Sequence, residues 1–354
     1  MSTTQRYLKG RGAQINPTGR FEKYLYDADP FAYMLEEDDP QLRTKIIDVH
    51  PKTILNKVSS PDIPFPYSLN PYQGCEHGCI YCYARNTHPF WGYSAGLEFE
   101  QKILVKRNAA DLLEEQLKSK RWRAEPIMLS GNTDCYQPVE RQLKITRSLL
   151  DVLWRYRHPV GIITKNSLVL RDLDYLQQLN EHNLVRVCIS VTTLDDRLRQ
   201  FMEPRTATVK GRLKTIRILA EHGIPVTAMM APIIPGLNDH EIFKLLEAVA
   251  EAGARNASYT IVRLNGDVAT IFEDWIRKNY PDRSDKILNK IKDCHGGQLE
   301  DKRFGKRMRG EGHVATMINQ QFKLARKQFF SDQRLPPMDT SLHDRFKTPQ
   351  LSLF

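Results

Sequence analysis

Residues 74–85 read Gly74-Cys75-Glu76-His77-Gly78-Cys79-Ile80-Tyr81-Cys82-Tyr83-Ala84-Arg85. This stretch holds three of the chain's six cysteines within eight residues, spaced C-x3-C-x2-C. Thiolates at such a spacing can converge on one soft metal centre, and Gly78 allows the backbone to fold back tightly between them. Three thiolates on a four-iron cube leave one iron without a protein ligand, so that iron can bind and reduce a small molecule. The stretch therefore predicts a metal centre with an open coordination position.

A structural zinc site is the alternative interpretation of the same cysteines. Zinc in such sites takes four closed ligands, usually as paired C-x2-C knuckles, and the sequence shows no second pair. His77 offers a fourth ligand, but it lies too near its neighbours in sequence to complete a good tetrahedron. Cysteines without any metal are a further alternative. Of these interpretations, the cluster accounts best for the spacing.

The pattern C-x3-C-x-aromatic-C is the signature of the radical S-adenosylmethionine (radical SAM) enzymes, and C-x3-C-x-Y-C-Y-A resembles the branch that contains spore photoproduct lyase. The resemblance covers residues from about 60 to 285. It implies a [4Fe-4S] cluster held by Cys75, Cys79 and Cys82, whose open iron chelates S-adenosyl-L-methionine. Reduction then yields a 5'-deoxyadenosyl radical, with the electron supplied by a donor such as flavodoxin or ferredoxin. The cofactor carries the difficult chemistry and the protein positions it.

The composition is that of a chain with a sizeable core and a basic surface. Its 354 residues are 41% hydrophobic, and the formal net charge is +10. No apolar run is long enough for a membrane span, and the start lacks the apolar stretch of a signal peptide. Clustered cysteines favour a reducing, cytoplasmic compartment. The charge favours an anionic partner, nucleic acid first, although a basic but inert surface remains the alternative.

The pattern from about residue 68 predicts six strand–helix units, with strands at 126–130, 160–164, 185–191, 225–233 and 258–264 after a first strand that leads into the cysteines. One long helix is expected over 139–156. Alternating strands and helices indicate a parallel sheet with right-handed crossovers. Six units match the partial (β/α)6 TIM-type barrel of radical SAM enzymes, an α/β fold. Sites in such barrels lie at the carboxyl ends of the strands.

Three segments follow from this division. Residues 1–60 form a basic, loop-rich amino-terminal extension, 61–285 the radical SAM core, and 286–354 a basic carboxyl-terminal extension. The turn-rich runs near residues 9–13 and 16–20 read either as an arm laid over a phosphate backbone or as a flexible tail.

The resemblance also implies which residues contact the cofactor. Related enzymes use a Gly-rich stretch with an acidic residue after the second strand, where this chain has Gly131, Asn132, Thr133 and Asp134 instead of the usual Gly-Gly-Glu. An ordinary strand-to-helix loop with Asp134 as a cap is the alternative. In the lyase-like enzymes a lysine after the third strand meets the methionine carboxylate, and Lys165 stands at that place.

Three further residues complete the implied set. Ser190 lies on the fourth strand, where a serine contacts the cofactor in similar proteins; the alternative is a hydroxyl satisfied by nearby backbone. Arg212 opens the next helix and can reach the carboxylate, although an exposed helix arginine is the plainer interpretation. Tyr81 lies in the signature, where an aromatic side chain commonly lies beside the adenine.

Cys135 lies outside the cysteine cluster, at the expected mouth of the second strand. Spore photoproduct lyase uses a non-cluster cysteine in a similar region to quench a radical with a hydrogen atom, and Tyr83 matches a tyrosine that assists it. These two residues are therefore candidate catalytic residues by resemblance. The alternative for Cys135 is a small, half-buried packing residue. Cys188, within the fourth strand, is expected in the core.

The last five residues are Gln350-Leu351-Ser352-Leu353-Phe354. They resemble the pentapeptide that many bacterial replication and repair proteins dock into the sliding clamp, because alternate apolar anchors on an extended tail can fill a hydrophobic groove. The alternative is a tail whose Leu353 and Phe354 tuck into the chain's own core.

Together these features predict a radical SAM enzyme that acts on a DNA lesion in the manner of spore photoproduct lyase. The lesion would have to be flipped out of a duplex to reach a barrel mouth. Because fold does not fix substrate, RNA, protein or a small metabolite remain alternative substrates. A non-catalytic iron–sulfur protein that binds nucleic acid is the alternative from another class.

Overall fold

The computed structural model describes residues 7–18, 21, 43–330 and 336–347. Its main sheet has seven strands in the order β10-β9-β8-β7-β6-β3-β2, of which all but β2 run parallel. The strands are β2 (Leu55–Lys57), β3 (Tyr67–Leu69), β6 (Ile127–Leu129), β7 (Val160–Thr164), β8 (Val185–Ser190), β9 (Val226–Ile233) and β10 (Asn256–Ile261). The expected partial (β/α)6 barrel is confirmed.

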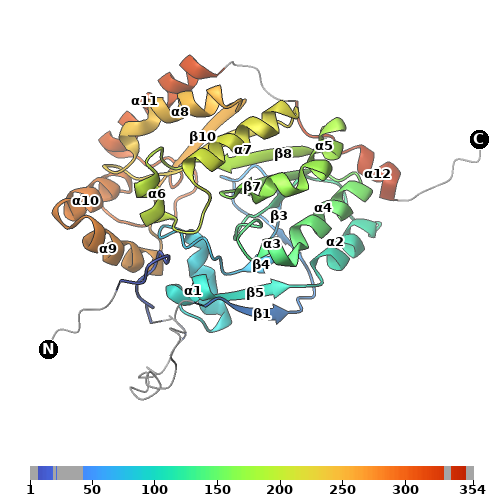
Figure 1. The fold of residues 1–354 in the computed structure, drawn as a ribbon, viewed down its shortest axis with the longest axis horizontal. Coiled ribbons are helices and arrows are strands. Elements are labelled where there is room, and N and C mark those ends of the chain that lie inside the picture. Colours follow the sequence, from blue (N-terminus) through green and yellow to red (C-terminus); the bar gives the residue numbers. More distant parts are fainter. Residues whose placement is uncertain (1–6, 19–20, 22–42, 331–335, 348–354) are drawn as a thin grey trace, which may run out of the picture.

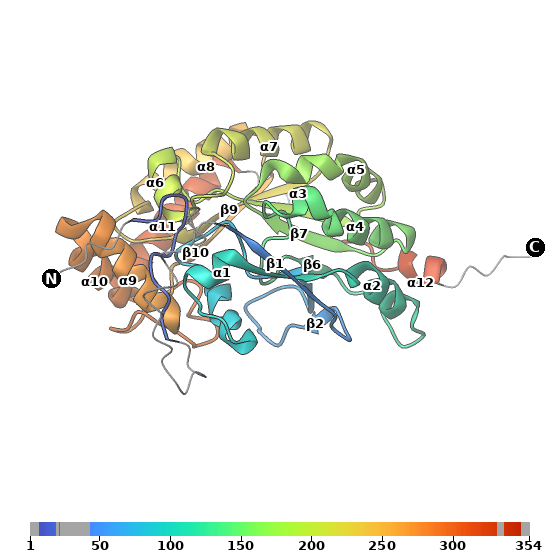
Figure 2. The same ribbon diagram turned by 60° about the horizontal axis from the view of Figure 1, so that its bottom comes forward.

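Helices connect the parallel strands and cover the convex face of the sheet (Figure 2). They are α2 (Ala109–Lys118), α3 (Glu140–Leu143), α4 (Ile145–Arg155), α5 (Leu173–Glu181), α6 (Asp196–Met202), α7 (Val209–Glu221), α8 (Ile242–Glu251) and α9 (Asp267–Asn279). The longer helices bury an apolar stripe at helical spacing, as α4 does with Leu149, Leu150 and Leu153, whereas the short α3 buries Glu140.

The single helix expected over 139–156 is wrong, because the chain breaks at Lys144. This residue adopts a left-handed backbone conformation, with φ of 54°, between α3 and α4. The Thr146 amide, freed at the start of α4, donates a hydrogen bond of 3.1 Å to the side chain of Glu140. The break thus has a local partner that apolar periodicity does not reveal.

Side chains alternate along the strands between helix layer and barrel interior. Ile162 of β7 and Val187 and Ile189 of β8 belong to the main hydrophobic core beneath the helices. Ile163 and Cys188, which alternate with them, are half-buried and face the barrel interior. Cys188 was expected in the core, and the structure instead places it outside the buried clusters.

A small second sheet, absent from the sequence-based prediction, joins β1 (Lys45–Val49), β5 (Lys102–Lys106) and β4 (Tyr72–Gln73) in the order β1-β5-β4. Figure 1 shows these strands together beside the main sheet. Strand β5 follows directly after the short helix α1 (Leu97–Gln101). Since β4 directly precedes Gly74, this sheet fixes where the cysteine stretch begins.

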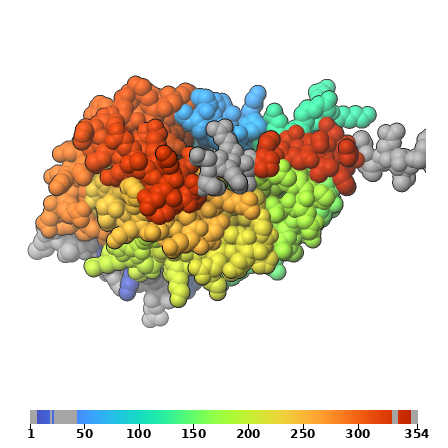
Figure 3. Space-filling model, turned by 90° about the horizontal axis from the view of Figure 1, so that it is seen from above, coloured from blue at the N-terminus to red at the C-terminus, as the bar shows by residue number. Residues whose placement is uncertain are grey.

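The carboxyl-terminal part contributes α10 (Ser284–Cys294), α11 (Gly312–Phe329) and α12 (Leu342–Lys347). Helix α11 buries Ile318, Phe322 and Ala325, and Figure 3 shows it beside α8. The tail 350–354 lies outside the described residues, so the clamp-like pentapeptide has no structural account. Among the helices of the described ranges, none combines the length and apolar character needed to cross a membrane.

Candidate active site

The cysteine loop, residues 74–82, follows β4 at the carboxyl end of β3. Cys75 and Cys79 are both 7% exposed and Cys82 is half-buried, and all three are free thiols. Burial, followed by the charges of Asp134, Cys79 and Cys82, raises the pKa of Cys75 well above its usual value. The three thiols therefore lie within electrostatic range of one another, at the end of the barrel where sites of this fold occur.

The chemistry of these donors fits an iron–sulfur cluster. Burial disfavours the thiolate form of Cys75 and Cys79 by raising the pKa of each thiol, and iron bound to them would supply the missing positive charge. Among the described residues, no three His, Cys, Asp or Glu side chains are grouped so as to hold a metal ion. A four-iron cluster makes a different demand, because each thiolate binds its own iron atom.

His77 and Asp134 tie the cysteine loop to the ends of β6 and β7. His77 Nδ1 lies 3.3 Å from Asp134 Oδ2, and His77 Nε2 lies 3.3 Å from the side-chain nitrogen of Asn166. Both ring nitrogens are engaged, so the alternative of His77 as a fourth zinc ligand finds no free nitrogen.

Asp134 is also fully occupied by protein donors. Its Oδ1 accepts from the Thr164 hydroxyl at 2.8 Å and the Tyr136 amide at 2.9 Å, and its Oδ2 accepts from the Lys165 amide at 2.8 Å. Burial would raise the pKa of Asp134, but the charge and hydrogen bond of His77 and these amides hold it at about 2. Asp134 thus joins loops rather than presenting a free carboxylate.

The other residues after β6 are tied to the segment after β3. The amides of Asn132 and Thr133 donate to Asn70 Oδ1 at 2.7 and 3.3 Å. The Thr133 hydroxyl donates to the Tyr72 carbonyl at 2.7 Å. A Cβ at Gly131 would lie 2.7 Å from that of Ser68. Close packing against the Ser68 side chain, and not only a ligand, therefore accounts for glycine here.

Tyr81 and Arg212 meet at a residue that sequence reasoning missed, Glu203. The Tyr81 hydroxyl and the Arg212 guanidinium both bond to the Glu203 carboxylate, and Thr192 Oγ1 adds a hydrogen bond of 3.0 Å. Burial would raise the pKa of Glu203, but the charges of Arg212 and Lys165 hold it below its usual value.

Arg212 is buried, 2% exposed, so the exposed helix arginine expected from its position is wrong. Its Nη1 also donates to the Ser190 carbonyl at 2.9 Å. Ser190 ends β8 and is itself buried. Through these contacts Arg212 joins the end of β8 to Glu203, which in turn holds Tyr81 of the cysteine loop.

Lys165 has hydrogen-bonding capacity to spare. It follows β7 directly and is half-buried. Burial would lower the pKa of its ammonium, but the charges of Cys79 and Glu203 outweigh it and raise that pKa. Within the described part of the chain its Nζ has no hydrogen-bond acceptor. A cation between the cysteine loop and β7 suits a ligand carboxylate.

Tyr83 and Cys135, the proposed catalytic pair, lie in different surroundings. The Tyr83 ring is 51% exposed, and its hydroxyl donates to the Gly131 carbonyl. Cys135 is fully buried in the main core, where its carbonyl accepts from Thr146 Oγ1 at 2.6 Å. The structure does not bring Cys135 to the open surface that Tyr83 occupies, and its position fits the packing alternative.

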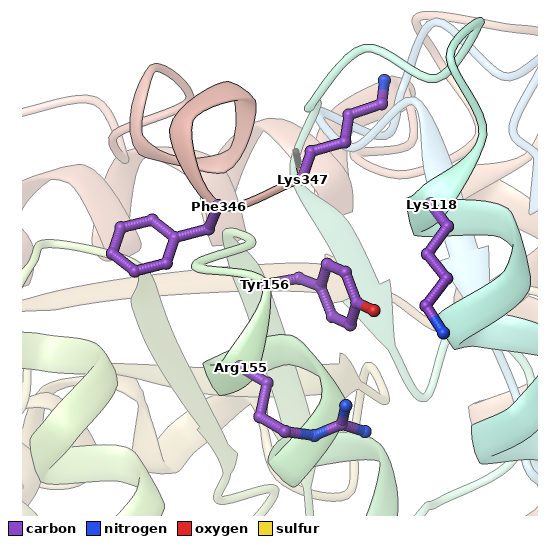
Figure 4. A pocket seen from close by; sticks show the side chains of 5 residues that line it. All are labelled: Lys118, Arg155, Tyr156, Phe346 and Lys347. Atoms are coloured by element: carbon purple, nitrogen blue, oxygen red, sulfur yellow. The ribbon is translucent and has the colours of Figure 1, made fainter. Parts of the chain in front are cut away.

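A surface pocket of about 420 Å³ lies elsewhere, at the amino-terminal ends of the strands (Figure 4). Its lining is Lys118, Arg155, Tyr156, Phe346 and Lys347. Glu114 pairs with Lys118 at 2.8 Å and with Arg155 at 2.9 Å. Because Tyr156 precedes β7, this pocket is at the opposite end of the barrel from the cysteines.

Comparisons with known proteins agree with this geometry. The Radical SAM superfamily matches residues 69–249. An uncharacterized protein of Mycobacterium tuberculosis H37Rv is 32% identical over 234 residues, 65% of this chain and 69% of its own length. One of Methanocaldococcus jannaschii is 29% identical over 249 residues, covering 70% of this chain and 88% of its own.

Among solved structures, a variant of spore photoproduct lyase with bound AdoMet and dinucleoside spore photoproduct has the same fold. It gives a TM-score of 0.58 at 18% identity, covering 80% of this chain and 79% of its own. The fold and the cysteine loop define a radical SAM protein. The chain belongs to the radical SAM superfamily.

Proposed function

We propose that this protein is a radical SAM enzyme in which Cys75, Cys79 and Cys82 hold a [4Fe-4S] cluster. The observation that carries the proposal is the gathering of two buried thiols and the half-buried thiol of Cys82 at the carboxyl end of the barrel, near the ammonium of Lys165, which has no hydrogen-bond acceptor among the described residues. When bound, such a cluster supplies the electron that cleaves S-adenosyl-L-methionine to a 5'-deoxyadenosyl radical. Flavodoxin or ferredoxin is the proposed source of that electron.

The protein's own contribution is to hold ligands and exclude water. Lys165 would bind the methionine carboxylate, and Ser190 and Asn132 line the neighbouring strand ends. Tyr81, held by Glu203, presents a fixed ring beside the cysteines. Because Arg212 and Asp134 already have protein partners, we assign them to orienting Tyr81, His77 and the Lys165 backbone, from where they support the cofactor site.

We further propose that the substrate is DNA, by analogy with the lyase whose fold this chain shares. The net charge of +10 supports an anionic partner. The basic run after residue 301 supports it less than its composition suggests, because neighbouring acids neutralise much of it. Arg303 pairs with Asp301, Lys306 with Glu311, and Arg307 with Asp62.

Arg263 is a better candidate for contact with a phosphate. It lies two residues after β10 and is half-buried. Within the described residues its guanidinium has no hydrogen-bond or ion-pair partner, although Tyr83 lies within electrostatic range. A guanidinium with free donors beside an exposed aromatic ring suits a nucleotide, since arginine binds phosphate and the ring stacks on a base.

Anaerobic reconstitution followed by dithionite and S-adenosyl-L-methionine tests the enzyme proposal. Release of 5'-deoxyadenosine is the expected result. A stable cluster without any release would instead favour the non-catalytic nucleic-acid-binding protein. Transfer of deuterium between labelled cofactor and damaged DNA, compared with RNA, peptide and small-molecule pools, identifies the substrate class.

Two further proposals concern partners and place. The tail Gln350, Leu351, Ser352, Leu353 and Phe354 would dock into the sliding clamp, and deletion of 350–354 should abolish retention on immobilised clamp. Unchanged retention would remove that proposal.

A cytoplasmic location is proposed from the cysteine usage, and fractionation of the source cells checks it.

A further inference from the structure

Residues 11–17, here called the strap, lie against the cysteine loop through Glu100. The Gly12 amide donates to Glu100 Oε2 at 3.0 Å, and the Ala13 amide donates to Oε1 at 2.8 Å. Arg11 Nη1 donates to the Glu100 carbonyl at 2.9 Å. Arg11, Ala13 and Glu100 are all buried. The glycine-rich amino-terminal run is therefore neither a flexible tail nor free for a phosphate backbone at these residues.

Glu100 passes these contacts on to the cysteine loop through Arg85. Arg85 Nη2 lies 2.5 Å from Glu100 Oε1, and both side chains are fully buried. Arg85 Nε donates to the Cys79 carbonyl at 2.9 Å, and its Nη1 donates to the Gly96 carbonyl at 2.9 Å. A buried carboxylate needs such a set of donors. One connected chain of hydrogen bonds thus runs from the strap to the backbone of Cys79.

The strap also touches the loop directly at Gly12. A Cβ on Gly12 would lie 1.7 Å from the Gly78 carbonyl oxygen and 3.0 Å from Ile80 Cγ2. The obstacle is backbone between Cys75 and Cys79, which cannot move aside without moving the cysteines. Two backbones therefore approach here as closely as only glycine permits.

The far end of the strap is fixed to the segment that leads into Glu100. The Leu97 amide donates to the Ile15 carbonyl at 3.2 Å, and the Glu98 amide donates to Asn16 Oδ1 at 3.1 Å. A Cβ on Gly96 would lie 2.0 Å from the Ile15 carbonyl oxygen. The strap is thus held at Ile15 and Asn16 as well as at the Glu100 contacts.

We propose that the strap positions the cysteine loop for cluster assembly, with Glu100 as the positioning residue and Gly12 setting the approach. The inference rests on the proposed cluster. A fixed backbone keeps the three thiols placed for one cluster. Arg85 holds the Cys79 carbonyl, and Gly12 packs against the Gly78 carbonyl. The strap also removes this side of the loop from solvent, which protects a reduced cluster.

The test is Gly12→Ala in the full chain. After anaerobic reconstitution we expect loss of most of the iron, sulfide and visible absorbance, and an altered EPR signal in any reduced cluster that forms. Gly211→Ala is the matched control, because Gly211 also lacks a positive φ and a Cβ there would meet nothing closer than Thr208 Oγ1 at 3.1 Å. It should load like the parent.

A second variant covers the case in which Gly12→Ala does not fold. Asn16→Ala removes one hydrogen bond at an exposed edge of the strap. We therefore expect a folded protein that binds iron but loses it to a chelator faster than the parent does. Parental iron content in Gly12→Ala together with a parental rate of loss in Asn16→Ala overturns the strap proposal. A parent that takes up no iron overturns the proposed function instead.

Discussion

Tyr81 and Glu203 are joined by a hydrogen bond between the cysteine loop and the residue that follows α6. Glu203 is fully buried and binds Arg212 with its other oxygen. The bond places the aromatic residue of the signature in one orientation. It also makes the loop's conformation depend on a segment more than a hundred residues away in sequence.

Glu203→Gln should lower the free energy of unfolding by roughly 3 kcal/mol, because it leaves the buried Arg212 guanidinium without its counter-ion. Urea unfolding at neutral pH measures the change. Glu221→Gln, at the exposed end of α7, is the control and should leave stability unchanged. Equal midpoints for both variants would show that the buried pair contributes nothing net.

Lys165→Gln should weaken binding of S-adenosyl-L-methionine by roughly tenfold to a hundredfold, since hydrogen bonds to charged groups contribute about 1.5–3 kcal/mol. Calorimetric titration of the anaerobic protein measures this affinity. The exposed Lys214→Gln on α7 should bind like the parent. An unchanged dissociation constant for Lys165→Gln would contradict its assignment to the carboxylate.

Arg263→Gln should weaken DNA binding and reduce the slope of log K against log salt by about one, as expected for the loss of one phosphate contact. Binding isotherms over a range of salt concentrations give both quantities. The control Arg217→Gln removes a charge from the exposed surface of α7 and so has the same net charge as Arg263→Gln. If both variants shift the slope alike, bulk charge and not a defined contact is responsible.

Cys135→Ala should lower stability by about 1 kcal/mol, because it removes a buried sulfur from the core. Cofactor cleavage and product distribution should stay those of the parent, since the residue has no exposed surface. Thermal unfolding and product chromatography measure the two effects separately. A changed product distribution would restore Cys135 as the hydrogen-atom donor that the resemblance implies.

Acid should destabilise the protein through His158. Burial, with the charge of His343, lowers the pKa of His158 from 6.5 to about 3. Between about pH 6.5 and 3 the unfolded state therefore binds a proton at His158 and the folded state does not. The contribution of His158 to the free energy of unfolding is complete above about pH 6.5 and falls as the pH drops towards 3. In His158→Gln the slope of unfolding free energy against pH should flatten between these limits.

The alternation of strands and helices was predictable because each unit carries its own periodicity. The apolar stripe of α4 and the run Val160–Thr164 of β7 depend only on neighbouring residues. The β1–β5 pairing was not predictable in the same way. It joins Lys45–Val49 to Lys102–Lys106, and half-exposed β1 carries no strong pattern of its own.

The site residues likewise divide into those that the local sequence predicts and those that depend on distant segments. Cys75, Cys79 and Cys82 have a spacing that specifies their chemistry. Glu100 and Glu203 have none, because their roles come from burial beside arginines that arrive from other segments. Glu100 stands between the polar residues Glu98 and Gln101, so the local sequence gives no signal for its burial. Nothing local distinguishes Glu203.

The separation of Gly12 from Glu100 by 88 residues has a consequence for biosynthesis. The ribosome makes residues 11–17 first, yet their carboxylate partner emerges only after all three cysteines have been polymerised. The strap can therefore close over the cysteine loop only after residue 100 has been made, so this contact forms after the synthesis of the loop that it covers.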